Sequence, residues 1–244
     1  MTLLHVKELS KEQILHGISF DMEQGELLAV MGPSGSGKST LLYNVAGMDR
    51  PTAGEVWLRD TEITGLSEDE KAALRLRRMG FVFQQINMMP NLNILDNILL
   101  PAFHANRGRQ KKSGLRLRAR DLMEKMSISG LEQRRITEVS GGQLQRACIC
   151  RSMMNRPEIL FADEPTGALN SKTGLDVLDT LTKFNGQGVS VVMVTHDMRS
   201  ARRGNRILYL KDGVILGECI LGTYVHGDTA RHEKLAAFLT EMGW

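Results

Sequence analysis

The stretch Glu26–Thr40, ELLAVMGPSGSGKST, decides the fold that we expect for this chain. Its first part, Glu26–Met31, is a short and mostly apolar run, typical of a buried strand. A glycine-rich turn follows, and a helical pattern begins at Lys38. The sequence therefore predicts a strand, a loop and a helix in direct succession.

The turn inside this stretch predicts a phosphate-binding loop, because GPSGSGKST matches the pattern GxxxxGK[ST]. Its glycines let backbone N–H groups approach phosphate oxygens, and the following helix start adds positive potential. Lys38 is expected to bind the β- and γ-phosphates, and the Ser39 hydroxyl to bind Mg²⁺. The predicted nucleotide-binding residues of this loop are Gly32, Ser34, Gly35, Ser36, Gly37, Lys38, Ser39 and Thr40.

Length and composition narrow the class of protein. The chain has 244 residues, 42% hydrophobic and 24% charged, which fits one globular α/β domain. A net charge of +3 does not demand a nucleic-acid partner. Three cysteines form no disulfide framework, which favours a reducing cytoplasm. Because no run approaches the roughly 20 apolar residues that span a bilayer, we expect any membrane role to be peripheral.

Two acidic side chains end a second apolar run, EILFADE at Glu158–Glu164. Asp163 is expected in the Mg²⁺ shell, and Glu164 is expected to polarise a water for attack on the γ-phosphate. Alone, such a pair is more often a strand-end feature, but the phosphate loop upstream reverses those odds. The runs Ile159–Ala162 and Val189–Val194 are typical of central parallel strands that are covered on both faces.

A third motif, VSGGQ at Val139–Gln143, precedes a helical pattern, and Ser140 is a good N-cap for that helix. On its own the motif indicates only a cap. The three motifs together, in their order along the chain, resemble those of ABC-transporter ATPases, whose hallmark LSGGQ differs here only at Val139. The resemblance runs through essentially the whole chain. It implies one domain, 1–244, with a P-loop ATPase core of mostly parallel sheet, an antiparallel β subdomain and a helical subdomain at about 86–155.

The resemblance also assigns roles to residues outside the phosphate loop. Gln84 in GFVFQQ corresponds to the Q-loop, which senses Mg²⁺ and the attacking water, and His196 in VTHD to the switch histidine, which bonds the γ-phosphate. In this family two ATPase subunits meet head to tail. The resemblance therefore implies catalytic residues Glu164, His196 and Gln84, metal ligands Ser39, Gln84 and Asp163, and contacts to the facing subunit's ATP from Ser140, Gly141, Gly142 and Gln143.

The partners that the resemblance implies are a transmembrane permease and a second, identical ATPase subunit, with ATP and Mg²⁺ at the site. It places the chain at the cytoplasmic face of the membrane, without membrane insertion and without nucleic acid. The segments GFVFQQINMMPNLNILDNILLP and ADEPTGALNSKTG look like the lipoprotein-release and macrolide-export group, and most like its bacitracin and lantibiotic resistance branch. The function expected is thus an ATPase subunit for peptide-antibiotic resistance or export.

Two departures from the family pattern stand out. The segment Leu9–Leu15 lacks the aromatic residue on which the family stacks adenine, and Asn170 replaces the usual aspartate of the D-loop. The first departure predicts weak base discrimination, because stacking contributes about 1 kcal/mol.

The segment Ile86–Phe103 carries more apolar side chains than a solvated connector needs. Either these residues are buried in the helical subdomain, or Met88, Met89 and Leu92 form a groove for a cytoplasmic helix of the permease.

Two other classes of function stay open at this point. A soluble cassette ATPase acting on DNA or ribosomes usually needs a long coiled coil or a second cassette, for which this chain has no room. A small-molecule kinase could use the same phosphate loop, but it would not explain SGGQ or His196.

Overall fold

Two β-sheets organise the protein, seen here in a computed structural model that describes residues 1–106 and 111–244. Residues 107–110, which belong to the expected helical subdomain, lie outside the described residues. The smaller sheet is antiparallel, in the order β2-β1-β4-β5. Its strands are β1 (Thr2–Lys11), β2 (Leu15–Glu23), β4 (Ala53–Leu58) and β5 (Thr61–Glu62).

The larger sheet has the order β10-β9-β3-β8-β7-β6. All neighbouring strands in it are parallel except the pair β9 and β10. Its strands are β3 (Leu27–Met31), β6 (Met79–Val82), β7 (Ile159–Asp163), β8 (Ser190–Val194), β9 (Arg206–Lys211) and β10 (Val214–Ile220). The mostly parallel central sheet and the antiparallel subdomain are both confirmed.

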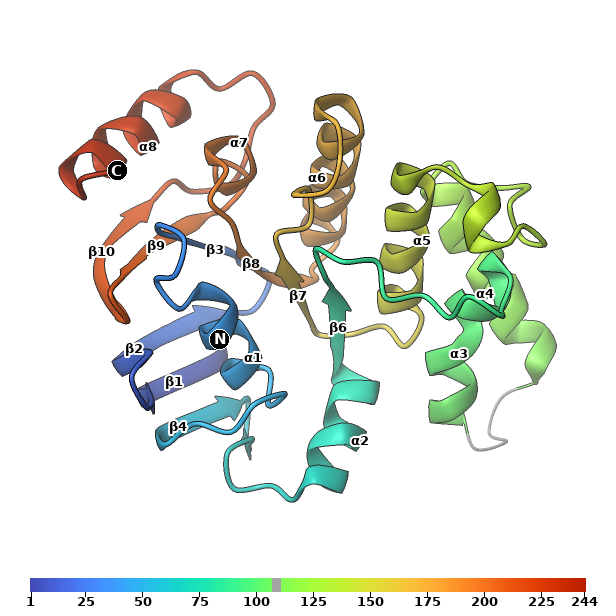
Figure 1. Ribbon diagram of the computed structural model, residues 1–244, viewed down its shortest axis with the longest axis horizontal. Helices are drawn as coiled ribbons and strands as arrows, with labels where there is room; N and C mark the ends of the chain where they lie inside the picture. The colour runs from blue at the N-terminus through green and yellow to red at the C-terminus, as the bar shows by residue number, and fades with distance from the viewer. Residues whose placement is uncertain (107–110) are drawn as a thin grey trace.

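The helices surround the sheets in separate groups (Figure 1). Helices α3, α4 and α5 lie together at one side and come between β6 and β7 in the chain. The bounds are α1 (Lys38–Val45), α2 (Glu68–Arg78), α3 (Ile94–Asn106), α4 (Lys112–Lys125), α5 (Gly141–Met153), α6 (Ser171–Gly186), α7 (Met198–Ala201) and α8 (Ala230–Glu241), with a short 3-10 turn at Ile136–Glu138.

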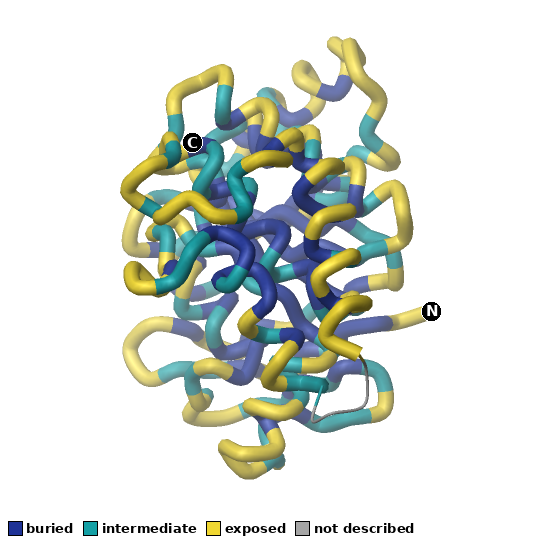
Figure 2. The backbone as a smooth tube through the Cα atoms, turned by 90° about the vertical axis from the view of Figure 1, so that its right-hand side faces the viewer, coloured by how far each residue is buried: buried dark blue, intermediate teal, exposed yellow. Residues whose placement is uncertain are grey.

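Alternation along the central strands divides the core into two parts. On β3, Leu28 and Val30 face a cluster shared with α1 and the antiparallel sheet, whereas Ala29 and Met31 face a cluster shared with the helical side. Every residue of β3, β7 and β8 is buried, as expected for parallel strands that are covered on both faces. In Figure 2 the buried stretches of the backbone gather at the centre of the molecule and the exposed stretches lie around them.

The first strands are longer than their apolar runs predict. The sequence indicates strands at Leu3–Val6 and Ile14–Phe20, but β1 continues to Lys11 and β2 to Glu23. Strand β1 pairs with β2 on one edge and with β4 on the other, with register shifts along both pairings. These backbone hydrogen bonds carry the strand through polar residues that hydropathy alone would assign to a turn.

No helix within the two described ranges is long and apolar enough to cross a membrane.

Candidate functional site

The phosphate loop connects the buried strand β3 to helix α1, as predicted. Gly32 passes so close to β9 that a Cβ atom there would lie 1.9 Å from the carbonyl oxygen of Leu210, so only glycine fits. The Ser36 hydroxyl is buried and, among the described residues, has no hydrogen-bond partner. A buried hydroxyl without a partner is unfavourable, and a phosphate oxygen would satisfy it.

Lys38 begins helix α1, and its side chain folds back over the loop. Its ammonium group donates to the carbonyl oxygens of Gly32, at 2.8 Å, and Pro33, at 2.7 Å. Burial lowers the pKa of Lys38, and the carboxylates of Glu164 and Asp163 oppose that effect. The cation is therefore held at the loop, within the electrostatic reach of both acidic side chains.

Asp163 ends strand β7 and contacts the phosphate loop directly. The Ser39 hydroxyl donates to its Oδ1 at 2.9 Å, and the hydroxyl of Tyr43 donates to its Oδ2 at 2.5 Å. Asp163 is only 6% exposed, so these donors supply hydrogen bonds that water would otherwise make to its side chain. The structure thus brings together Ser39 and Asp163, two of the predicted metal ligands.

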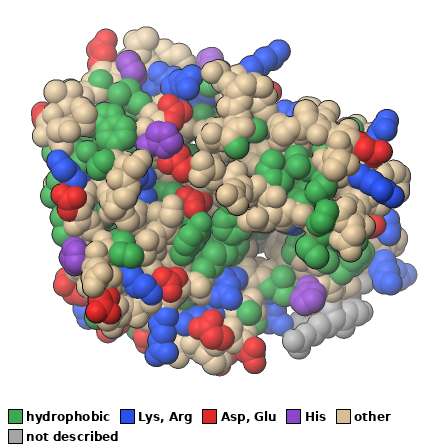
Figure 3. Space-filling model, in the orientation of Figure 1, with side chains coloured by type: hydrophobic (Ala, Val, Ile, Leu, Met, Phe, Trp, Pro, Cys, Tyr) green, Lys and Arg blue, Asp and Glu red, His purple; other side chains and the backbone are tan. Residues whose placement is uncertain are grey.

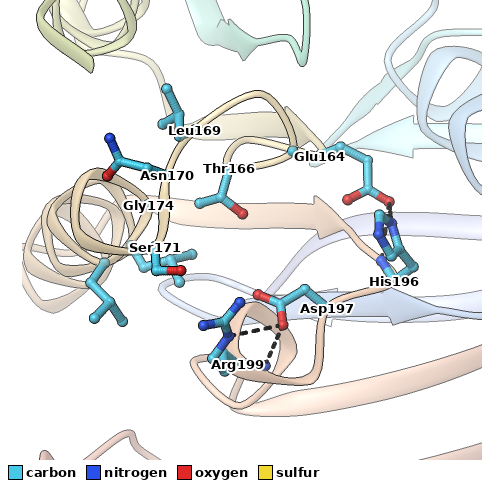
Figure 4. A pocket seen from close by; sticks show the side chains of 12 residues that line it. Glu164, Thr166, Leu169, Asn170, Ser171, Gly174, His196, Asp197 and Arg199 are labelled. Atoms are coloured by element: carbon cyan, nitrogen blue, oxygen red, sulfur yellow. Dashed lines mark hydrogen bonds and ion pairs between the residues drawn. The ribbon is translucent and has the colours of Figure 1, made fainter. Parts of the chain in front are cut away.

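Glu164 follows in a left-handed backbone conformation, with φ of 43°. Its Oε1 accepts the backbone N–H of His196 at 3.0 Å and lies 2.7 Å from Nδ1 of the same residue. The Thr195 hydroxyl donates to Oε2 at 3.3 Å. Figure 4 shows the Glu164 and His196 side chains pointing toward one another. A strained backbone held by three contacts fixes the direction of this carboxylate.

These elements meet in one cleft of about 510 Å³. The phosphate loop forms one wall, and Gln84, Glu164 and His196 come from the ends of three different strands. A parallel sheet brings the carboxyl ends of its strands to the same edge, which explains why residues so far apart in the chain converge. The cleft is lined by Ile14, Ser34, Gly35, Gly37, Lys38, Ser39, Thr40, Gln84, Glu164 and His196.

The VSGGQ motif lies elsewhere. Ser140 caps α5 as predicted: its Oγ accepts the N–H of Gln143 at 3.3 Å, and the Gln143 side chain accepts the N–H of Ser140 at 2.9 Å. Ser140 and Gly141 are exposed, and neither lines the phosphate cleft of its own chain. The start of α5 is therefore free to contact a second molecule.

Asn170, the D-loop departure, caps another helix. Its side-chain oxygen accepts the N–H of Thr173 at 3.0 Å at the start of α6. In Figure 4 it lies with Leu169 and Ser171 on the far side of the same pocket as Glu164 and His196. An aspartate could make the same cap, so the substitution keeps the hydrogen bond and removes a charge.

Two residues of the site were not anticipated from the sequence. Gln145 is 2% exposed, and its amide donates to the carbonyl oxygens of Phe83, at 3.3 Å, and Pro165, at 3.2 Å. It thereby ties α5 to the loops that carry Gln84 and Glu164. The signal for Gln145 in the sequence is a glutamine on a helix face whose other buried residues are small or apolar. No pattern in the sequence indicates that Tyr43 is the second hydrogen-bond donor to Asp163.

A separate apolar groove of about 530 Å³ lies between β6, α2 and α3. Figure 3 shows hydrophobic side chains gathered around a hollow on this face. Its lining includes Met48, Leu76, Phe81, Phe83, Leu100, Pro101 and His104.

Of the two alternatives for Ile86–Phe103, burial holds at Met88, which is 7% exposed and packs in the core, and none of Met88, Met89 and Leu92 lines the observed groove. The Asn97 side chain bonds the backbone N–H and carbonyl of Met89, which draws this segment against α3.

A cleft with a phosphate loop, an acidic side chain and a histidine, with Asp163 buried against the loop, lies at the edge of a parallel sheet and defines a nucleotide-binding protein of the P-loop class. Residues 15–167 match the family model described as ABC transporter. The chain belongs to this family.

Relatives at about 40% identity support the assignment. The macrolide export ATP-binding/permease protein MacB of Sodalis glossinidius is 43% identical over 205 residues, which cover 84% of this chain and 31% of that protein. This chain therefore spans about a third of the length of the MacB relatives that it matches. The uncharacterized ABC transporter ATP-binding protein MJ0796 of Methanocaldococcus jannaschii is 43% identical, over 82% of this chain and 86% of that protein.

Solved structures agree. The dimeric structure of MJ0796, a bacterial ABC transporter cassette, superposes with a TM-score of 0.84 at 39% identity, and covers 91% of this chain and all of that one. A dimeric post-hydrolysis state of MJ0796 bound to ADP and Pi gives a TM-score of 0.83 at 38% identity. The α/β cassette fold is confirmed.

Proposed function

We propose that this chain binds and hydrolyses ATP to drive a membrane permease, as one of two identical cassettes. The observation that carries the proposal is the convergence of Lys38, Gln84, Glu164 and His196 on one cleft, beside the Ser39–Asp163 contact. Residues 1–244 act as a single domain in this proposal, with the helical subdomain at 86–155.

Magnesium fits the donors that are present. The Ser39 hydroxyl and the Asp163 carboxylate already touch, and both are the oxygen ligands that this ion prefers. Gln84, in the same cleft, offers an amide oxygen as a third ligand. When bound, Mg²⁺ offsets the charge of the phosphate oxygens.

Each catalytic residue then has a distinct task. Glu164 orients the attacking water and accepts its proton, because its carboxylate faces the cleft and is held by its neighbours. His196 contacts the γ-phosphate through the imidazole nitrogen that does not face Glu164. Lys38 moves from the loop carbonyls to the β- and γ-phosphates, exchanging neutral acceptors for charged ones.

A second cassette completes the site. The N–H groups at the start of α5 lie outside the lining of their own cleft, and a helix start favours anions. We infer that they contact the γ-phosphate of the facing subunit, with Gln143 supporting the cap. ATP would then hold the two cassettes together, and hydrolysis would release them.

The groove beside β6 is the proposed docking surface for a cytoplasmic helix of the permease. It is apolar, partly open and adjacent to the loop that carries Gln84. An amphipathic helix buries such surface by the helix-in-groove mode. The chain would then lie on the cytoplasmic face of the membrane without entering it, and the permease would select the cargo.

The process that we propose is peptide-antibiotic resistance or export. This proposal rests on the sequences of residues 80–101 and 162–174.

Leu100→Glu tests the docking surface, because Leu100 lines the groove and is 39% exposed. We expect the variant to leave membranes that contain the permease while ATP affinity and the melting temperature stay near wild type. Leu117→Glu is the matched control, since Leu117 is 71% exposed on α4 and lies outside the groove. Continued membrane association of the Leu100 variant would refute the assignment. Identifying the membrane protein that co-purifies with the wild-type chain tests the proposed process.

Nucleotide selectivity tests the missing aromatic residue. Ile14, 40% exposed, lines the cleft beside the phosphate loop, where an aliphatic side chain gives no ring to stack on. We expect GTP to compete with ATP within about a hundredfold, which corresponds to about 2.7 kcal/mol. Ile14→Tyr should tighten ATP binding about fivefold, because stacking adds about 1 kcal/mol. Competitive titration of both nucleotides measures each effect, and a stronger ATP preference in the wild type would reveal another adenine contact.

A further inference from the structure

Tyr43 occupies a position on α1 that no motif accounts for. It follows Ser39 by four residues, so the two side chains lie on the same face of the helix, one turn apart. That face is directed at the end of β7. Each oxygen of the Asp163 carboxylate consequently accepts one hydrogen bond from a hydroxyl on α1. Oδ1 accepts from Ser39 at 2.9 Å, and Oδ2 accepts from Tyr43 at 2.5 Å.

The two hydroxyls are not equivalent. Ser39 belongs to the phosphate loop and is itself a proposed metal ligand, so its contact with Asp163 would be rearranged when the metal binds. Tyr43 lies one turn deeper and contacts only the oxygen on the other side of the carboxylate. Its hydrogen bond can persist in both states.

The Tyr43 ring is itself held in place by aromatic neighbours. Its centroid is 6.4 Å from that of Phe83, and Phe83 stacks on Phe81 at 6.0 Å with an angle of 7°. Phe81 and Phe83 also line the apolar groove. Tyr43, Phe83 and Phe81 therefore form an aromatic row that runs from the groove to the carboxylate.

We propose that Tyr43 is a positioning residue for Asp163: its hydroxyl fixes Oδ2 and thereby keeps Oδ1 on the Ser39 side, where Mg²⁺ would be held. The proposal rests on the function proposed above, because it takes Asp163 as a metal ligand. A carboxylate with one oxygen anchored loses less rotational freedom on binding a metal, and outer contacts of this kind typically change metal affinity 10- to 100-fold.

The chemistry of the phenol supports this role. The phenol hydroxyl donates to Oδ2, and a carboxylate oxygen accepts, so the contact has the direction that an anchoring hydrogen bond needs. A purely space-filling tyrosine would need its ring but not its hydroxyl.

Tyr43→Phe separates these two roles, since it removes the hydroxyl and keeps the ring. Binding of a fluorescent, non-hydrolysable ATP analogue is titrated at increasing Mg²⁺ and, separately, in EDTA. We expect the Mg²⁺ concentration for half-maximal binding to rise about tenfold. The affinity for the analogue in EDTA should stay within twofold of wild type. The melting temperature should stay within a few degrees of wild type. A half-maximal Mg²⁺ concentration within twofold of wild type would overturn the proposal.

Two further variants make the outcome specific. Tyr224→Phe is the matched control, because Tyr224 lies under the Arg203 guanidinium, outside the phosphate cleft. Asp163→Asn distinguishes the two levels of the proposal. If it leaves the Mg²⁺ dependence unchanged, Asp163 is not a ligand and the proposed function of that residue fails. If Asp163→Asn abolishes the Mg²⁺ dependence but Tyr43→Phe does not shift it, only the role of Tyr43 fails. If Tyr43 acts through Asp163, adding Tyr43→Phe to Asp163→Asn has no further effect on the Mg²⁺ dependence of nucleotide binding.

Discussion

Glu164→Gln is expected to bind ATP with wild-type affinity and to lower turnover by about a hundredfold or more. The amide keeps the size of the side chain, and its oxygen can still accept the backbone N–H of His196. The loss would therefore come from the missing charge, which orients the water and takes up its proton. Because ATP is bound but not cleaved, the variant should accumulate as a dimer. Light scattering and phosphate release measure the two effects.

Glu124→Gln provides the matched control, since Glu124 lies exposed on α4 and outside the phosphate cleft. It should behave as wild type in both assays. Turnover of Glu164→Gln at the wild-type rate would remove Glu164 from the catalytic role, whatever its effect on dimerisation.

Gly141→Asp is expected to abolish ATP-dependent dimerisation and to lower ATPase activity by about a hundredfold. A Cβ at Gly141 meets nothing within 4 Å, and an acidic residue is favourable in the first turn of a helix. The isolated subunit should therefore fold and bind ATP normally. The carboxylate would repel the γ-phosphate of the facing subunit. Gly142 is unsuitable for this test, because a Cβ there would lie 2.1 Å from the Thr173 side chain.

Gly114→Asp is the corresponding control. Gly114 also lies in the first turn of a helix, α4, and a Cβ there likewise meets nothing within 4 Å. The same substitution should leave dimerisation and activity unchanged. An ATP-dependent dimer of Gly141→Asp, seen by light scattering, would show that the start of α5 does not face a second nucleotide.

The local parts of the fold could be predicted because short-range physics determines them. The spacing of Ser67 and Glu70 predicts a capping box, and helix α2 begins with it: Ser67 Oγ accepts the N–H of Glu70, and the Glu70 carboxylate accepts the N–H of Ser67. The capped start of α5 and the buried parallel strands followed from spacing and apolar periodicity in the same way. Each of these features depends on residues only a few positions apart.

What the sequence could not predict depends on contacts between distant segments. Tyr43 and Asp163 are 120 positions apart, and nothing near Tyr43 indicates which strand end it meets. Met88 looked available for a partner because its apolarity was visible, whereas the Asn97 contacts that draw its neighbour Met89 against α3 were not. The start of α5 is proposed to complete the catalytic site of another molecule. Within one chain it therefore lies outside the phosphate cleft.

The aromatic row carries a thermodynamic consequence for the permease. It connects the groove to an oxygen of Asp163 through side chains that touch one another, so displacement of Phe83 by a docked helix would be transmitted to the carboxylate. Linkage between two binding equilibria is reciprocal. Whatever factor the docked helix applies to magnesium affinity, magnesium must apply to the affinity for the helix. If docking raised the magnesium affinity, the cassette with bound magnesium would bind the permease more tightly than the empty cassette does. The affinity for the permease would fall as the metal and the hydrolysis products dissociate.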